Sequence, residues 1–269
     1  MTELLRLSGR VSELAAGLTV RRVLPAAGRR SVGPFVFFDH FGPVTFKPET
    51  DSDVGAHPHI GLATVSYLFE GSLLHRDSLG TVQTITPGAI NWMTAGRGIV
   101  HSERTLDEER GESRRLHGLQ LWVALPLELQ ACEPSFQHVP AAELPALELD
   151  RGVQVRVLVG EAFGALRPVR AASPTLYLDV QIAPDSQWVL PALASEMALY
   201  SPQLSFVLDG QTIESQEMAV LPRGSGAVLH AGAQGARLVV IGGAPLAQPV
   251  RMWWNFVATD RERIAHAAK

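Results

Sequence analysis

Two pairs of residues carry most of the chemistry that this 269-residue sequence could perform. His57 and His59 stand two positions apart in VGAHPHIGLATV, and His101 and Glu103 repeat that spacing in GRGIVHSERT. Residues two positions apart on a β-strand point to the same face, so each pair can aim two polar side chains at one point. Three imidazoles and one carboxylate suit a divalent transition metal, and Fe, Mn, Co, Ni, Cu and Zn all accept such ligands.

A metal ion would also explain why these polar groups occupy segments that otherwise resemble buried strands. Unpaired polar groups on an inward apolar face are costly, and coordination to an ion compensates them. Four protein ligands leave up to two open positions on an octahedral ion, as a catalytic site requires. Any single histidine among the nine is more often structural than a ligand, but two such pairs in one barrel predict a metal site.

The elements that must position these pairs are strands. The 24 glycines and 18 prolines punctuate short runs rich in Val, Leu, Ile, Phe and Tyr, which is typical of an all-β protein. Residues 63–77 and 204–215 both suggest a hairpin, with turns at Glu70-Gly71 and Asp209-Gly210. Their similarity predicts a duplicated β-barrel.

We therefore expect an all-β fold of two tandem β-barrels with a short C-terminal helix. The metal-binding barrel is placed at residues 1–135, a proline-containing linker at 136–152, and a second barrel at 153–269. In the C-terminal segment TDRERIAHAAK, Thr259 and Glu262 predict a capping box at the start of the helix.

The second barrel is expected to lack a metal. Aligning the turns at Gly71 and Gly210 places Glu196 and Ala198 where the first half has His57 and His59, and no H-x-H occurs in the second half. The isolated His230 is interpreted as structural.

Composition excludes some partners. The 23 basic and 27 acidic residues give a net charge of -4 without a long basic run, so nucleic acid is not an expected direct partner. No apolar run approaches the roughly 20 residues of a transmembrane helix, and no secretory signal is evident. The single cysteine cannot close an intramolecular disulfide. These features predict a soluble, cytoplasmic protein that does not bind membranes.

Several segments of the first half, in order, resemble the pirin family, a bicupin branch of the cupin superfamily. They are FFDHFGP (37–43), HPHIGLATVSYLFEG (57–71), HRDSLG (75–80), PGAINWMTAGRGIVHSE (87–103) and HGLQLWVALP (117–126). The resemblance is weaker in the second half, where it rests on SPTLYLDV and GGAPLAQPV.

The resemblance implies two tandem, jelly-roll-like cupin barrels with one mononuclear metal, usually iron, in the N-terminal barrel. The implied ligands are His57, His59, His101 and Glu103. The chain departs from many pirins at Ile60 and Ala63, where Arg and Glu are common. The glutamate that cupins generally carry shortly after the second histidine is also missing, so the carboxylate must come from Glu103.

Two kinds of function remain open at this point. Several pirins are described as quercetin 2,3-dioxygenases, which implies a flavonol-like substrate and O2, with Glu103 as a base for the substrate hydroxyl. The alternative is a metal-dependent, redox-sensing regulatory module with a protein partner, since animal pirins are described as nuclear co-regulators. Another cupin reaction, such as isomerisation, would use the same ligands. If Phe37, Phe38 and Trp92 line a solvent-open pocket, a substrate is favoured; if they plug the barrel, the module is.

Other polar residues near the site give weaker indications. His75 and Asp77 could line the entrance, although a charged hairpin end is usually just solvated. Gln120 is a possible hydrogen-bond partner of a ligand. We expect His40 and His117 to be scaffold residues.

Overall fold

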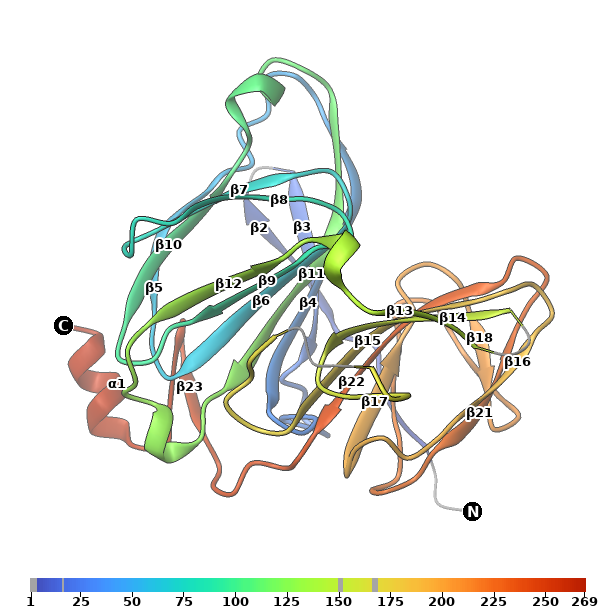
Figure 1. Cartoon of the computed structure of the whole chain (residues 1–269). Coiled ribbons are helices and arrows are strands. Elements are labelled where there is room, and N and C mark those ends of the chain that lie inside the picture. The colour runs from blue at the N-terminus through green and yellow to red at the C-terminus, as the bar shows by residue number, and fades with distance from the viewer. Residues whose placement is uncertain (1–3, 16, 150–151, 166–168) are drawn as a thin grey trace. The chain divides into compact units, whose positions relative to one another are not determined.

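The computed structural model describes residues 4–15, 17–149, 152–165 and 169–269, which form strands, three 3₁₀ turns and one short α-helix (Figure 1). The chain divides into two compact units. Barrel A comprises residues 10–22, 36–142 and 246–269, and barrel B comprises residues 1–9, 23–35 and 143–245. No helix in these described ranges is long and apolar enough to cross a membrane.

Barrel A is built from two antiparallel sheets. The larger sheet has seven strands, in spatial order β12 (Ser135–Val139), β9 (Ile90–Thr94), β6 (Leu62–Glu70), β11 (Arg114–Ala124), β4 (Phe35–Phe46), β3 (Leu18–Leu24) and β2 (Arg10–Ala15). The smaller sheet has four strands, β5 (Val54–His59), β10 (Ile99–Arg104), β7 (Leu73–Asp77) and β8 (Val82–Ile85). The remaining elements are η1 (Asp107–Glu109), η2 (Leu127–Leu129), the β23 (Arg251–Trp253) and β24 (Phe256–Ala258) hairpin, and α1 (Arg261–Ala267).

The core of barrel A lies between its two sheets. Ile99 of the smaller sheet packs with Met93 and Trp122 of the larger one, and Ile85 packs with Leu68 in a second cluster. Apolar side chains on the facing surfaces of two sheets are what removes both sheets from water.

Barrel B repeats this architecture. Its larger sheet has the order β1 (Leu5–Leu7), β20 (Met218–Val220), β17 (Glu196–Tyr200), β22 (Ala236–Gly243), β15 (Thr175–Ile182), β14 (Val153–Val159) and β13 (Ala146–Leu149). Its smaller sheet is β16 (Gln187–Leu190), β21 (Ala227–Ala231), β18 (Phe206–Leu208) and β19 (Gln211–Ile213). Both barrels therefore combine a seven-stranded and a four-stranded sheet, which confirms the predicted all-β fold of two barrels.

The two expected hairpins are not equivalent. β18 and β19 do pair around Asp209-Gly210, and both turn residues have positive φ, 48° and 77°. Glu70-Gly71 instead joins β6 of the larger sheet to β7 of the smaller one, so no hairpin forms there. Local sequence cannot distinguish a hairpin from a crossing between sheets, because both need the same tight turn.

Strand order gives the correct correspondence between the barrels. Strands β5 and β10 of barrel A correspond to β16 and β21 of barrel B, whereas Glu196 lies on β17, the counterpart of β6. The alignment of Glu196 and Ala198 with His57 and His59 is therefore wrong. Buried apolar residues occupy the corresponding strands of barrel B, among them Trp188, Leu190 and Leu229.

The unit boundaries differ from the expected ranges. The segment expected as a linker, 136–152, supplies most of β12 to barrel A and all of β13 to barrel B, with η3 (Ala141–Glu143) between them. Both chain ends also differ, since β1 pairs with β20 in barrel B and residues 246–269 belong to barrel A. Each of these segments pairs with or packs against the barrel to which it belongs. The barrel that a segment joins depends on tertiary pairing and cannot be predicted from its local sequence.

The C-terminal helix forms where it was expected, but a different residue caps it. Asp260 accepts a hydrogen bond from the Glu262 amide at 2.9 Å. The Thr259 hydroxyl and amide both donate to Gln130 Oε1, so the Thr259 side chain binds Gln130 and does not cap the helix. Ile264 packs the helix onto Ile60 and Phe256 of barrel A.

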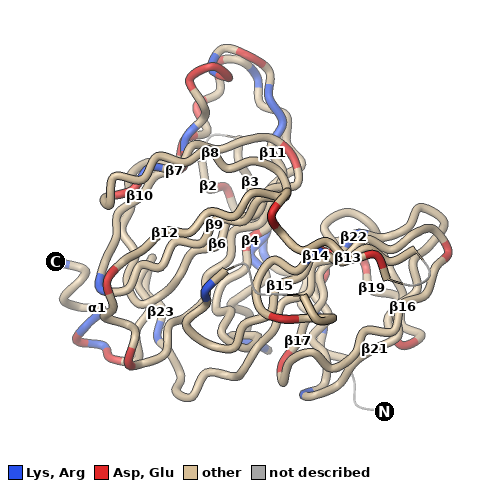
Figure 2. The backbone as a smooth tube through the Cα atoms, in the orientation of Figure 1, with Lys and Arg blue, Asp and Glu red and all other residues tan. Residues whose placement is uncertain are grey.

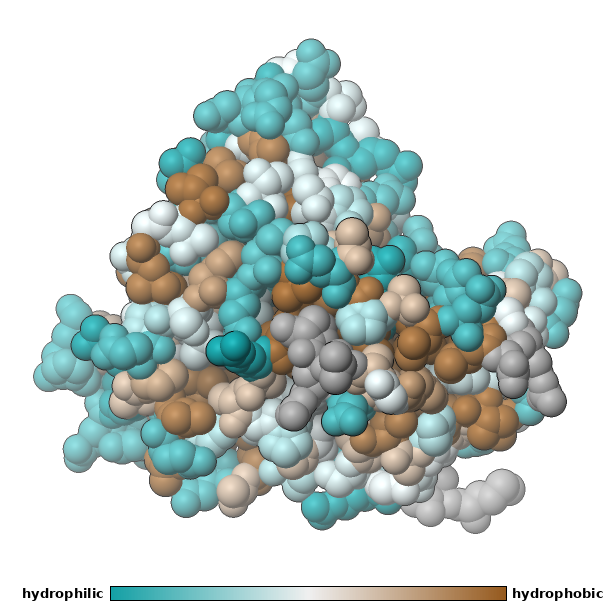
Figure 3. Space-filling model, in the orientation of Figure 1, coloured by the Kyte–Doolittle hydropathy of each residue, from teal (hydrophilic) through white to brown (hydrophobic). Residues whose placement is uncertain are grey.

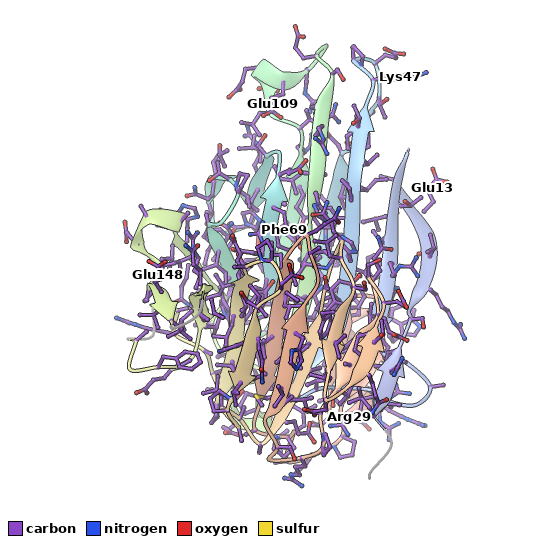
Figure 4. The ribbon with its side chains drawn as sticks, turned by 90° about the vertical axis from the view of Figure 1, so that its right-hand side faces the viewer. Glu13, Arg29, Lys47, Phe69, Glu109 and Glu148 are labelled. Carbon is purple, nitrogen blue, oxygen red and sulfur yellow. The ribbon has the colours of Figure 1, made fainter. Side chains whose placement is uncertain are left out.

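Charged residues of barrel A concentrate at strand ends and turns, whereas β9 and β12 carry none (Figure 2). Lys47 and Glu109 project from one end of the barrel (Figure 4), and that end is hydrophilic in the space-filling view (Figure 3). The polar pairs predicted to bind metal belong to a different environment, on strands that face the apolar interior.

A buried histidine pair in barrel A makes stability sensitive to pH. His40 and His117, the expected scaffold residues, lie on β4 and β11, and their Nε2 atoms are 2.9 Å apart. Burial, together with the nearby His117 and Arg21, lowers the pKa of His40 to about 3. His40 is therefore neutral in the folded protein at pH values where the unfolded chain is protonated.

We predict that this position makes the folded protein less stable in acid. Between pH 6.5 and about 3 the unfolded state binds one more proton at His40 than the folded state. The free energy of unfolding then falls by about 1.4 kcal/mol per pH unit for this residue. Urea unfolding at pH 7, 6 and 5 should show a shallower slope for His40→Gln. The exposed His230→Gln should keep the wild-type slope, and equal slopes for all three proteins would contradict the prediction.

Candidate metal centre

The strand pair β5 and β10 brings the predicted histidines together. The two strands are antiparallel neighbours in which His57 faces His101 and His59 faces Ile99. The smaller sheet thus places three imidazoles from two segments, more than forty residues apart in sequence, on one face of adjacent strands.

The three rings converge at metal-binding distance. His59 Nε2 and His101 Nε2 are 3.1 Å apart, and one nitrogen from each of His57, His59 and His101 lies within 4.8 Å of the others. Two nitrogens bound at about 2.1 Å to one ion, at a right angle, are about 3.0 Å apart. The spacing of His59 and His101 therefore fits two ligands of a single ion.

Backbone carbonyls orient two of the rings. His57 Nδ1 lies 2.8 Å from the Gly55 oxygen, and His59 Nδ1 lies 3.2 Å from the Asn255 oxygen. A carbonyl can only accept, so each Nδ1 carries the proton and each Nε2 has a free lone pair. Metal-binding histidines are typically held in this way.

Burial keeps His59 and His101 uncharged. It lowers the pKa of His101 to about 2, with His57 and His75 contributing, and it holds the pKa of His59 well below its usual value. Neutral imidazoles with converging lone pairs are good donors for a cation.

Two glycines allow the turns beside the site to cross closely. Gly61 follows β5, Gly96 precedes β10, and the Gly61 amide donates to the Gly96 oxygen at 2.9 Å. Both have positive φ, 70° and 52°, and a Cβ on Gly61 would lie 1.9 Å from the Val257 oxygen. The close approach of backbone atoms at these two turns therefore requires glycine at both positions, including the one before β10.

Glu103 lies beside the histidine cluster but is not part of it. Its Oε1 is 3.7 Å from His101 Nδ1, the nitrogen on the other side of that ring from the cluster. The pairing of β10 with β5 shifts register between His101 and Glu103, so the two residues do not keep simple strand alternation. The structure thus brings three of the four predicted ligands together, and the fourth stays a prediction.

His75 and Asp77, expected at a solvated entrance, are instead buried against His101. Their side chains are 4% and 0% exposed. On β7, Asp77 faces His101 and His75 faces Glu103. The sequence carried a signal for this, because HRD repeats the spacing of HPH and HSE, but only the pairing of β7 with β10 gives it a place.

An aromatic stack fills the barrel next to His59. The Arg22 guanidinium lies 4.3 Å from the Phe37 ring centre, Phe37 stacks on Trp122 at 4.0 Å, and the edge of Trp122 meets His59 at 5.2 Å. Asp39 holds Arg22 through two hydrogen bonds of 2.9 and 2.8 Å. The stack supports one face of a candidate ligand with packed side chains.

Gln120, expected as a hydrogen-bond partner of a ligand, and two exposed tryptophans near the site have other surroundings. Gln120 accepts a hydrogen bond from Ser66 on the neighbouring strand at 2.8 Å, and this is an interaction within the larger sheet. Trp253 and Trp254 are 55% and 57% exposed at the β23–β24 turn, directly before the Asn255 carbonyl that holds His59. The buried Phe256, rather than these tryptophans, packs against α1.

Comparison with known proteins identifies the family. Residues 17–123 match the family described as Pirin, and residues 177–269 match the Pirin C-terminal cupin domain. The chain belongs to the pirin family. Its two barrels are therefore cupin domains, and the histidine cluster lies in the N-terminal one.

Relatives cover nearly the whole of this pirin chain. A pirin-like protein from Caulobacter vibrioides is 43% identical, over 92% of this chain and 86% of its own length. Human pirin is 36% identical, over 93% of this chain and 85% of its own. A crystal structure described as quercetin 2,3-dioxygenase from Acinetobacter baumannii has a TM-score of 0.90 and 34% identity, covering 98% of this chain and 86% of that one.

We predict that the cluster stabilises the fold when a metal is added. A ligand at 100 times its Kd raises the free energy of unfolding by about 2.7 kcal/mol. Thermal unfolding with increasing Co²⁺ should therefore show a rising midpoint. His101→Ala should abolish the increase because it removes the central donor, whereas His230→Ala in barrel B should retain it. The same Co²⁺-dependent rise in His101→Ala would contradict this assignment.

Proposed function

We propose that this pirin-family chain is a metal-dependent oxidoreductase of the quercetin 2,3-dioxygenase type. It would hold one divalent transition metal through His57, His59 and His101, with Glu103 turning in as the fourth ligand. The observation that carries the proposal is the convergence of three imidazoles in the N-terminal cupin barrel. The name of the Acinetobacter baumannii relative supports a flavonol-like substrate and O2. A cytoplasmic location stays a prediction from the sequence.

Iron is the metal we propose. The donor set is compatible with Mn, Co, Ni, Cu and Zn as well, since imidazole and carboxylate do not select strongly among these ions. When bound, the ion would lower the pKa of a coordinated substrate hydroxyl and orient the ring for reaction with O2.

Glu103 is the residue we assign to proton transfer. Its side chain is 11% exposed and lies outside the histidine cluster, so it can approach a hydroxyl held beside His101. As a carboxylate it would accept the proton of the substrate hydroxyl, and it would hold that proton away from the reacting ring. The apolar cluster of Met93, Ile99 and Trp122 would keep water from the same space.

A second function is favoured by one specific observation. Phe37, Phe38 and Trp92 are all buried, and Phe37 fills the barrel interior through its stack on Trp122. A filled interior favours a module in which the metal, or its oxidation state, alters a surface for a protein partner, without turnover of a small molecule.

One experiment separates the two functions. Purified protein is analysed for bound metal, loaded anaerobically with Fe²⁺, and then exposed to O2 with quercetin while flavonol absorbance and carbon monoxide are followed. Loss of quercetin with release of carbon monoxide is expected for the dioxygenase. Stoichiometric iron without turnover would favour the module, and a protein that carries no metal after purification and takes up no Fe²⁺ would contradict both.

We predict that Glu103→Gln lowers turnover more than metal content. Glutamine keeps the size of the side chain but is a very weak base, so a general-base role predicts a loss of roughly 100-fold or more in kcat. Metal content is measured on the same samples, and Glu108→Gln on the neighbouring surface turn serves as the control. Full turnover by metal-loaded Glu103→Gln would exclude Glu103 as the base.

A further inference from the structure

A line of three polar groups leads away from the candidate metal centre. His101 Nδ1 lies 3.4 Å from His75 Nδ1, and His75 Nε2 lies 3.0 Å from Asp77 Oδ2. All three side chains are buried, on the adjacent strands β10 and β7. This line lies on the opposite side of the His101 ring from its contact with His59.

The position of each proton in this line follows from hydrogen-bond chemistry. Two backbone amides donate to Asp77 Oδ1, and Oδ2 lies 3.0 Å from His75 Nε2, so both oxygens act as acceptors, as those of a carboxylate do. A carboxylate only accepts, and His75 therefore carries its proton on Nε2. In a neutral imidazole the other nitrogen, His75 Nδ1, is then an acceptor, and His101 donates to it from Nδ1. That leaves the lone pair of His101 on Nε2, facing His59.

The line is rigid at its far end. Asp77 Oδ1 accepts from the Leu79 amide at 2.9 Å and the Thr81 amide at 3.1 Å, so the carboxylate cannot rotate without losing both bonds. The His75 ring stacks on Phe136 with a centroid distance of 4.6 Å and an interplanar angle of 25°. Both side chains are thus held in one orientation.

We propose that Asp77 and His75 are positioning residues that set the tautomer of His101 and strengthen its Nε2 as a metal donor. His57 and His59 are oriented by backbone carbonyls, whereas His101 is oriented by these two side chains. Groups that hold the outer nitrogen of a metal-binding histidine typically change metal affinity 10- to 100-fold. The proposal rests on the proposed function only in taking His101 as a metal ligand.

Asp77→Asn is a selective test of this arrangement. The amide oxygen of asparagine must take the position of Oδ1, because two backbone N–H groups point there. The amide NH2 then faces His75 Nε2 and donates to it, which moves the His75 proton to Nδ1. His75 and His101 would then present two donors to each other, and His101 would lose its acceptor. A single isosteric substitution therefore reverses the direction of the hydrogen bond between position 77 and His75.

Two measurements on the full-length protein test the proposal. Long-range ¹H–¹⁵N correlation spectra of the histidine rings, with and without Zn²⁺, report which nitrogen of His75 and His101 carries the proton. Competition with a chelator gives the Kd for Co²⁺. In the wild type we expect His75 protonated on Nε2 and His101 on Nδ1. In Asp77→Asn we expect His75 protonated on Nδ1 and a Co²⁺ affinity about 10- to 100-fold weaker.

Further variants distinguish positioning from a general loss of structure. His75→Phe keeps the stack on Phe136 but removes both nitrogens, and it should weaken Co²⁺ binding to a similar extent. Because Asp77 acts through His75, the double variant of Asp77→Asn and His75→Phe should be no weaker than His75→Phe alone. His75→Asn, whose oxygen can take the place of Nδ1, should restore much of the affinity. Arg76→Gln, on the exposed face between the two residues, should bind Co²⁺ as the wild type does.

The outcomes separate this inference from the proposed function. A wild type in which His75 carries its proton on Nδ1 would overturn the proposed role of Asp77 and His75. The NMR measurement of this proton position needs no metal. Co²⁺ binding by the wild type with unchanged affinity in Asp77→Asn would also overturn that role while leaving the metal centre intact. Wild-type protein with the expected tautomers but no Co²⁺ binding would instead contradict the proposed function. It would then also exclude a role of Asp77 and His75 in positioning a metal ligand.

Discussion

The structure of barrel A depends on how it accommodates several imidazoles side by side in an apolar interior. His59 and His101 are buried with their Nε2 atoms 3.1 Å apart. A second proton on each ring would place two positive charges in contact without water between them. Burial therefore keeps the rings neutral, as the lowered pKa values of His59 and His101 reflect. Neutral rings then need an acceptor for each outer N–H, and their converging lone pairs could hold a cation.

The surrounding fold supplies these acceptors from three separate segments. Gly55 on β5 serves His57, Asn255 at the β23–β24 turn serves His59, and β7 supplies His75 for His101. The C-terminal hairpin is thus part of the site although it follows barrel B in the sequence. The close crossing beside β5 and β10 needs glycine at both Gly61 and Gly96, because any side chain there would clash with a backbone oxygen or carbonyl carbon.

The same interior bears on what the barrel can do. The stack from Arg22 through Phe37 and Trp122 reaches His59, so any molecule bound at the metal would meet a wall of fixed aromatic rings. These fixed rings help to orient a substrate if space for one remains beside the histidine cluster. If no such space remains, they favour a metal-dependent module without turnover. The chemistry of the donors serves both functions equally well, which is why turnover rather than metal content separates them.

Local sequence determined a large part of this protein. Glycine and proline punctuation of short apolar runs indicated strands and two barrels, because turns between strands favour these residues. The i, i+2 spacing of His57 and His59, repeated at His101 and Glu103, indicated a metal centre, because alternate residues of a strand share one face. Only the tertiary structure decided which strands are neighbours. It showed that Glu70-Gly71 crosses between sheets, that the proline-containing segment after barrel A supplies an edge strand to each barrel, and that Asp260 rather than Thr259 caps the helix. It also moved His75 and Asp77 from a solvated turn to the buried side of His101, and left Glu103 beside the cluster. The physical reason is the same each time: pairing between distant strands sets the contacts of a side chain, and a local pattern specifies only the face to which it points.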